Sequence, residues 1–129
     1  MAYKIERFND LPMILSIWDA DFSVSNDLIT YNTELATLLD AETHPVYHIV
    51  DMREVKMTFT DVMSAIQIGV KGEQATANHP NIRQIVVVTH SRMINMAAKG
   101  LNTMSFGNID MAVFETVEDA VGYVRQKAS

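Results

Sequence analysis

Near the N-terminus, apolar and polar residues alternate with a period of two, which is typical of a strand with one buried face. Residues 3–8 alternate in this way, and residues 13–18 form a second, mostly apolar stretch. Between them lie Asn9, Asp10 and Pro12, residue types that favour turns. We therefore expect residues 3–8 and 13–18 to pair as an antiparallel hairpin.

Three later apolar runs predict further strands. The run 46–50 is closed by Asp51, and the run 82–88 is rich in β-branched residues. Both are typical of strands that are covered on two faces, because they contain few alternating polar positions. A shorter run at residues 111–114 predicts the last strand.

Apolar residues at helical spacing predict four main helices, each preceded by a residue that can serve as an N-cap. The first helix is expected over residues 26–42, and the second is expected to stop near Gly72. The other two follow the strands at residues 82–88 and 111–114, and the last begins with Thr116 and Asp119 at the spacing of a capping box. The expected N-caps are Ser25, Thr60, Ser91 and Thr116.

The resulting order is β-β-α-β-α-β-α-β-α within one domain that covers residues 1–129. Helices between successive strands make right-handed crossovers and a parallel sheet. We therefore expect an α/β fold with a mixed, mostly parallel sheet of about five strands, an N-terminal antiparallel hairpin and about four main helices. Such sheets bind ligands or partners beyond the carboxyl ends of their strands, which here are residues 51–53, 89–91 and 115–116.

Charge and composition exclude several functional classes. Sixteen acidic residues against ten basic ones give a formal net charge of −6, so binding to a phosphate backbone has no electrostatic driving force. A membrane-spanning helix needs about 20 apolar residues, and no apolar run approaches that length. The chain has no cysteine and therefore no disulfide, thiolate nucleophile or zinc finger. We expect a cytoplasmic protein that binds no nucleic acid and does not insert into membranes.

The polar residues raise two further kinds of chemistry, a serine hydrolase and a metal or phosphate site. Asp51, His90 and Ser91 could meet at the carboxyl edge of the sheet as a small hydrolase, but Ser91 lacks a nucleophile elbow and is more simply an N-cap. The four histidines share neither a helical face nor a tight ligand spacing, and no glycine-rich phosphate loop is present. We therefore predict no catalytic residue, metal or cofactor. The histidines are His44, His48, His79 and His90.

The chain contains nine methionines, and two interpretations of them stay open. Those within predicted helices are typical of core packing, whereas those at predicted strand ends and in loops can line an apolar pocket with soft side chains. The second interpretation predicts a carrier or sensor of a small, apolar, lipid-like ligand. The methionines at strand ends and in loops are Met52, Met57, Met104 and Met111.

Residues 50–66, with the sequence VDMREVKMTFTDVMSAI, resemble the centre of the STAS family, which includes anti-sigma factor antagonists of the SpoIIAA type. In that family an apolar strand ends in Asp and an apolar residue follows four positions later, as Asp51 and Val55 do here. The order of the elements also resembles the STAS fold over essentially the whole chain. The sequence as a whole resembles a SpoIIAA-like bacterial branch that is sometimes grouped with the Sec14 lipid-binding fold.

The resemblance also implies a phosphorylation switch at the start of the second main helix. A gapless placement puts Thr60 and Asp61 where the family has a pair of serines, and Val62 where it has glycine. Phosphorylation adds about −1.5 to −2 charges at a helix start, and Asp61 already supplies a permanent negative charge there. The switch is therefore absent, locked in a phospho-like state or moved to Thr60, unless Thr60 is simply an N-cap.

From these features we expect a non-enzymatic regulatory or protein-interaction module, homodimeric or bound to another protein, that docks through the region from Asp51 to Met63. Recognition would combine a polar rim with apolar anchors. The carrier of an apolar ligand is the alternative, and the hydrolase is the least favoured hypothesis. The predicted rim residues are Asp51, Arg53, Thr60 and Asp61, and the predicted anchors are Met57, Phe59 and Met63.

Overall fold

The computed structural model of the chain describes residues 2–71, 76–77, 79–101 and 110–128. After an opening hairpin, strands and helices alternate as the sequence predicts. The elements are β1 (Tyr3–Phe8), β2 (Met13–Trp18), α1 (Val24–Asp40), β3 (Val46–Asp51), α2 (Phe59–Ile66), the π-helical turn η1 (Gln67–Lys71), β4 (Ile82–Val88), α3 (Arg92–Gly100), β5 (Met111–Phe114) and α4 (Val117–Ala128).

The five strands form one sheet in the order β1-β2-β3-β4-β5. β1 pairs with β2 in an antiparallel arrangement, and each of the other neighbouring pairs is parallel. The parallel pairs follow from the helices that connect β2 to β3, β3 to β4 and β4 to β5, since a chain that returns through a helix starts its next strand at the same edge. The predicted fold class is thus confirmed.

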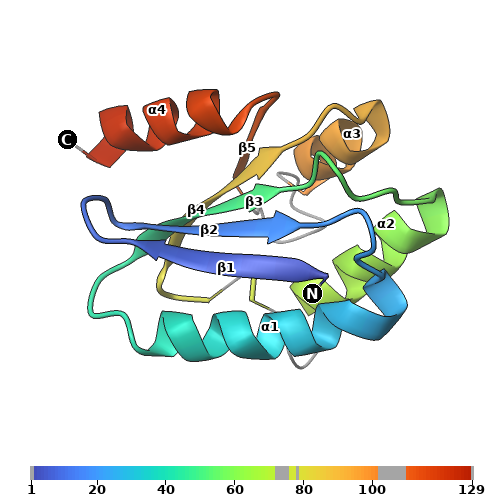
Figure 1. Cartoon of the computed structure of the whole chain (residues 1–129), viewed down its shortest axis with the longest axis horizontal. Coiled ribbons are helices and arrows are strands. Elements are labelled where there is room, and N and C mark those ends of the chain that lie inside the picture. The colour runs from blue at the N-terminus through green and yellow to red at the C-terminus, as the bar shows by residue number, and fades with distance from the viewer. Residues whose placement is uncertain (1, 72–75, 78, 102–109, 129) are drawn as a thin grey trace.

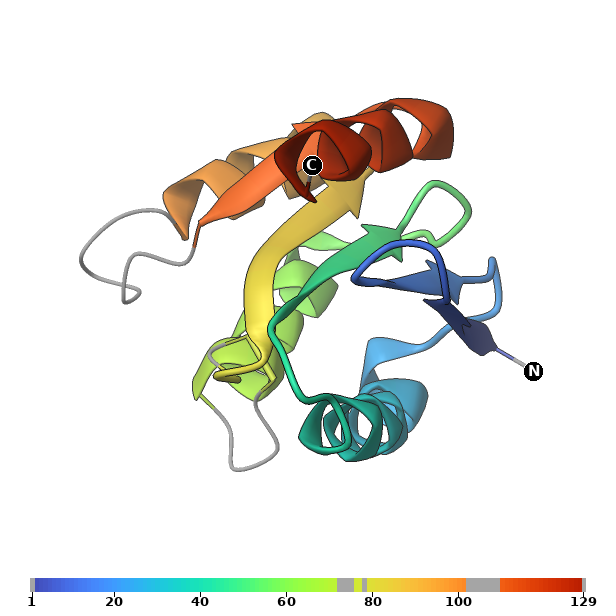
Figure 2. The same ribbon diagram turned by 90° about the vertical axis from the view of Figure 1, so that its left-hand side faces the viewer.

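Helices cover both faces of the sheet, with α1 below and α4 above in Figures 1 and 2. Side chains on each strand alternate between the two faces, which gives two separate cores. The face packed against α1, α2 and α3 is called the three-helix face, and the face packed against α4 is called the α4 face. On the central strands β2–β4, the three-helix face carries Ile14, Ser16, Trp18, Val46, His48, Val50, Ile85 and Val87. The α4 face carries Met13, Leu15, Tyr47, Ile49, Val86 and Val88.

Two of the predicted N-caps were wrong by two residues. α1 is capped by Ser23 and not by Ser25, and the earlier start buries Val24 in the core. α2 is capped by Thr58 and not by Thr60, because Thr58 has Asp61 at the third helical position and the two make a reciprocal capping box.

The other two predicted caps agree with the structure. The hydroxyl of Ser91 accepts a hydrogen bond from the N–H of Ile94 at 3.2 Å, and that of Thr116 accepts one from Asp119 at 3.0 Å. The expected stop at Gly72 and the methionine at position 104 lie outside the described residues.

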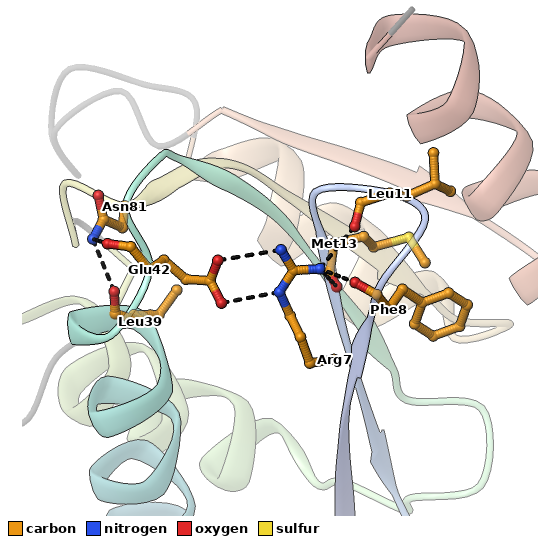
Figure 3. A network of polar contacts seen from close by, with 7 residues as sticks. All are labelled: Arg7, Phe8, Leu11, Met13, Leu39, Glu42 and Asn81. Carbon is orange, nitrogen blue, oxygen red and sulfur yellow. Dashed lines mark hydrogen bonds and ion pairs between the residues drawn. The ribbon is translucent and has the colours of Figure 1, made fainter.

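A polar network closes the edge of the sheet at which β1 ends and β2, β3 and β4 begin (Figure 3). The guanidinium of Arg7 donates to both carboxylate oxygens of Glu42, at 2.9 and 3.2 Å, and to carbonyl groups of the hairpin turn. The side-chain amide of Asn81 donates to the carbonyl oxygens of Leu39 and Glu42 at the end of α1. The turn carbonyls that accept from Arg7 are those of Phe8, Leu11 and Met13.

Candidate functional site

Asp51, at the end of β3, is buried and paired with Arg53. Nε and Nη2 of Arg53 each lie 2.9 Å from a carboxylate oxygen, and the backbone N–H of Arg53 donates to the same carboxylate at 3.1 Å. Burial raises the pKa of Asp51, but the hydrogen bonds and the charge of Arg53 outweigh it and hold the pKa below its ordinary value. This carboxylate therefore stays ionised and engaged within its own loop.

The predicted apolar anchors separate into two groups. Phe59 and Met63, one turn apart on α2, are 68% and 42% exposed. They line a shallow groove together with neutral polar side chains. Met57 is half-buried and contributes to a cavity on the opposite side of α2. The groove is lined by Phe59, Thr60, Met63, Ser64, Gln67 and Ile68.

Thr60 and Asp61 occupy different environments although they are adjacent. Thr60 is exposed within the groove. The Asp61 carboxylate accepts the backbone N–H of Thr58 at 3.0 Å as half of the capping box. The negative charge that the sequence places at this helix start is thus engaged with the backbone of α2.

The three residues of the hydrolase hypothesis each have another partner. His90 Nε2 lies 2.9 Å from the carbonyl oxygen of Glu115, Ser91 caps α3, and Asp51 is held by Arg53. A serine nucleophile needs a base within hydrogen-bond reach of its hydroxyl. The contacts of Ser91 serve the helix start and provide no such base.

A cavity of about 140 Å³ lies between the three-helix face of the sheet and the helices that cover it. α2 and η1 contribute Val62, Ala65, Ile66 and Gly69 to its wall, so the buried side of α2 faces the cavity while Phe59 and Met63 face outward. The wall is mainly apolar, and its described lining residues carry no charged side chain at neutral pH. The methionines that line it are Met52, Met57 and Met111, three of the four at predicted strand ends and in loops.

One end of the cavity is polar because β3 carries His48 in an otherwise apolar strand. His48 Nε2 lies 3.0 Å from the hydroxyl of Ser16 on β2 and 3.0 Å from the hydroxyl of Tyr31 on α1. Burial lowers the pKa of His48 to about 4, so the ring is neutral at neutral pH. Burial also raises the pKa of Tyr31, which is offset only in part by its polar neighbours Ser16 and Trp18.

Asn32 and Thr76 complete the polar end. Asn32 on α1 is 2% exposed, and its Oδ1 lies 3.5 Å from the hydroxyl of Thr76. Its amide nitrogen Nδ2 is buried without a hydrogen-bond partner among the described residues. The indole N–H of Trp18 also lacks one, although it lies close enough to the Tyr31 hydroxyl to affect its pKa.

Sequence reasoning missed Asn32, Tyr31 and Thr76 as functional candidates. The available signal was Asn32 itself, a polar residue four positions after Leu28 and three before Leu35 on the apolar side of α1. Of the four histidines, only His48 lines the cavity. Within the described part of the chain, no group of three acidic or histidine residues is arranged to hold a metal ion.

Comparison with known proteins supports the fold. No family model matches the chain, and no curated protein matches its sequence. The chain is similar to a crystal structure of an uncharacterised DUF3478-family protein from Shewanella loihica, described as having a SpoIIAA-like fold. The two share 15% identity with a TM-score of 0.61, over 95% of this chain and 92% of the other. The predicted SpoIIAA-like fold is thus confirmed. None of the described helices is long and apolar enough to cross a membrane.

Proposed function

We propose that this protein is a non-enzymatic binding module that holds a small, mostly apolar molecule in the cavity beneath α2. The observation that carries the proposal is the cavity itself, with its apolar wall and a few polar groups gathered at one end. Ligand sites in proteins have this composition. The module would carry or sense its ligand, as the methionine pattern suggested.

The size of the cavity supports this proposal and limits the ligand. Protein interiors are close-packed, and an unfilled void lowers stability by about 24 cal/mol per Å³. A molecule that fills the space of about 140 Å³ takes apolar wall out of water and gains packing contacts. An engineered apolar cavity of about 150 Å³ binds benzene, so a group the size of one ring fits here.

The test is a titration of the full chain with toluene, followed by two-dimensional NMR. In the wild type we expect saturable shifts at residues around the cavity, with a dissociation constant in the millimolar range or below. Replacing Ala98, a buried residue of the cavity wall, by leucine should fill the space and abolish the shifts. Phe59→Ala, on the outer side of α2, is the matched control and should bind toluene normally. Wild-type protein that shows no saturable shift overturns the proposal.

Exposure of Phe59 and Met63 favours a second function, self-association through the outer side of α2. The groove residues between them carry no charge, so two copies can meet there without direct repulsion despite a net charge of −6. Two α2 helices related by a twofold axis would bury the same apolar side chains on each copy. This proposal retains the predicted homodimer and commits the groove to a second copy of the chain.

Sedimentation equilibrium of the wild type and of a Phe59→Ala, Met63→Ala double variant tests the dimer. We expect a dimer that dissociates in the double variant while thermal unfolding stays cooperative. A wild type that remains monomeric at high micromolar concentration rules the dimer out. Phosphorylation of Thr60 stays a prediction, to be tested by mass spectrometry of the protein from its own host.

A further inference from the structure

Two buried donors that line the cavity lack a hydrogen-bond partner among the described residues, Trp18 Nε1, which lies near the Tyr31 hydroxyl, and Asn32 Nδ2. His48 Nε2 faces two hydroxyl groups, those of Ser16 and Tyr31, and one ring nitrogen forms one hydrogen bond at full strength. The imidazole nitrogen and these two hydroxyl groups therefore hydrogen-bond among themselves. The amide of Asn32 differs, since its oxygen faces Thr76 and its nitrogen faces no acceptor among the described residues.

The surroundings of Asn32 make this unpaired nitrogen unusual. The residue is 2% exposed, and the cavity wall near it is built from apolar side chains such as Leu28. Buried polar groups are nearly always hydrogen-bonded, so an amide without a partner is a place where an ordered water or a ligand oxygen can accept a hydrogen bond. A charged ligand would find no opposite charge on the described wall, so this wall favours a neutral ligand.

Resting on the proposed function, we infer that the ligand is a neutral, ring-sized molecule with a carbonyl or similar acceptor oxygen, and that this oxygen accepts a hydrogen bond from Asn32 Nδ2. Asn32 is then the residue that determines specificity, and Thr76 positions its amide by donating to Oδ1. The apolar body of the ligand lies against the methionine-lined part of the wall. A hydrocarbon of the same shape leaves the amide unpaired and binds less tightly.

Two probes of nearly the same shape test this inference. Cyclohexanone and methylenecyclohexane differ only in an oxygen that replaces a CH₂ group, so the ratio of their affinities reports on the acceptor. The ratio is measured by NMR titration in the wild type and in Asn32→Leu, a variant of similar volume that has no donor. The change in this ratio between the two proteins removes the difference in solvation of the probes in water.

A net hydrogen bond of typical strength corresponds to a factor of about 5 to 10 in affinity. We expect the preference for cyclohexanone to fall by about this factor in Asn32→Leu, and by less in Thr76→Val, which keeps the donor but releases the amide. Thr76→Val also provides a second reading if Asn32→Leu fails to fold.

The outcomes separate this inference from the proposed function. If both probes bind with the same ratio in the wild type and in the variants, the acceptor is wrong and cavity binding stands. The same result follows if ordered water already satisfies Nδ2, because the oxygen then gains nothing. If neither probe binds the wild type, the inference and the proposed function fall together.

Discussion

The two faces of the sheet differ in how their cores are built. The core of the α4 face is apolar, and Met13, Ile49, Val86, Val88 and Val124 are fully buried within it. The three-helix face holds a cavity and a buried imidazole whose Nε2 lies 3.0 Å from each of two hydroxyl groups. Because strand side chains alternate, neighbouring residues on one strand serve the two purposes. The unfilled space lies between the sheet and α1, α2 and α3, whereas α4 packs against a core without such a cavity among the described residues.

Large-to-small substitutions should change the free energy of unfolding most, and by different amounts on the two faces. Ile49→Ala on the α4 face and Ile85→Ala in the cavity wall remove the same atoms from adjacent central strands. Such changes cost about 2 to 5 kcal/mol in unfolding free energy, depending on how many contacts are lost. We expect Ile49→Ala near the upper end and Ile85→Ala near the lower end, measured by urea unfolding. Equal losses would mean that the two faces are packed alike.

The stability of the protein should also depend on pH through His48, which lies on the three-helix face. His48 has an ordinary pKa of 6.5 in the unfolded chain and a pKa of about 4 in the fold, so only the unfolded state binds its proton between these values. Unfolding free energy should therefore fall by roughly 3 kcal/mol as the pH drops from 6.5 to 4. The stabilisation from Asp51, whose pKa is lowered from 3.8, is lost mainly below this window.

The control for this pH dependence is His48→Gln, which replaces the imidazole by an amide that can still hydrogen-bond Ser16 or Tyr31 but does not titrate. Chemical denaturation at several pH values should give a flatter profile for the variant between pH 6.5 and 4. A variant that loses stability as steeply as the wild type would assign the effect to other groups.

Adding volume on each face should have opposite effects. Ala120 is fully buried against the α4 face, and replacing it by leucine should destabilise the protein by about 1 to 3 kcal/mol through overpacking. Ala98→Leu enters the cavity and should leave unfolding free energy within about 1 kcal/mol of the wild type or raise it. Thermal unfolding of the pair measures the difference. A comparable loss in both variants would show that the cavity cannot accept a side chain.

Glycine-to-alanine substitutions in the helices should change the free energy of unfolding least. A Cβ added at Gly122 of α4 or at Gly69 of η1 meets no other atom within 4 Å. Gly122→Ala should raise unfolding free energy by about 0.5 to 1 kcal/mol, because alanine restricts the unfolded chain and favours the helix. Gly69→Ala should give less, since η1 is π-helical. Calorimetry can resolve this order, and its reversal would contradict the assignment of η1.

Most of the fold could be predicted because strand patterns act locally. The expected runs 3–8, 13–18, 82–88 and 111–114 coincide with strands in the structure. Helix starts were harder, since Ser23 and Ser25 are both good caps by residue type. Burial of Val24 decided between them, and that burial depends on the sheet below the helix.

The candidate site was only partly predictable. Methionines at strand ends indicated an apolar pocket, and exposure of Phe59 and Met63 agrees with an outward-facing contact surface on α2. The cavity could not be predicted because its volume depends on how closely three helices approach the sheet. The unpaired amide of Asn32 depends in turn on Thr76, which is 44 positions away in the chain.

The guanidinium of Arg7 has a consequence for how the molecule assembles. It joins the hairpin turn to Glu42, 35 positions further along the chain, and Glu42 in turn accepts from Asn81. These contacts form only after distant segments have met, and the entropy of closing such loops opposes early formation. We therefore expect this network to stabilise the assembled edge of the sheet and to contribute little to the earlier steps of folding.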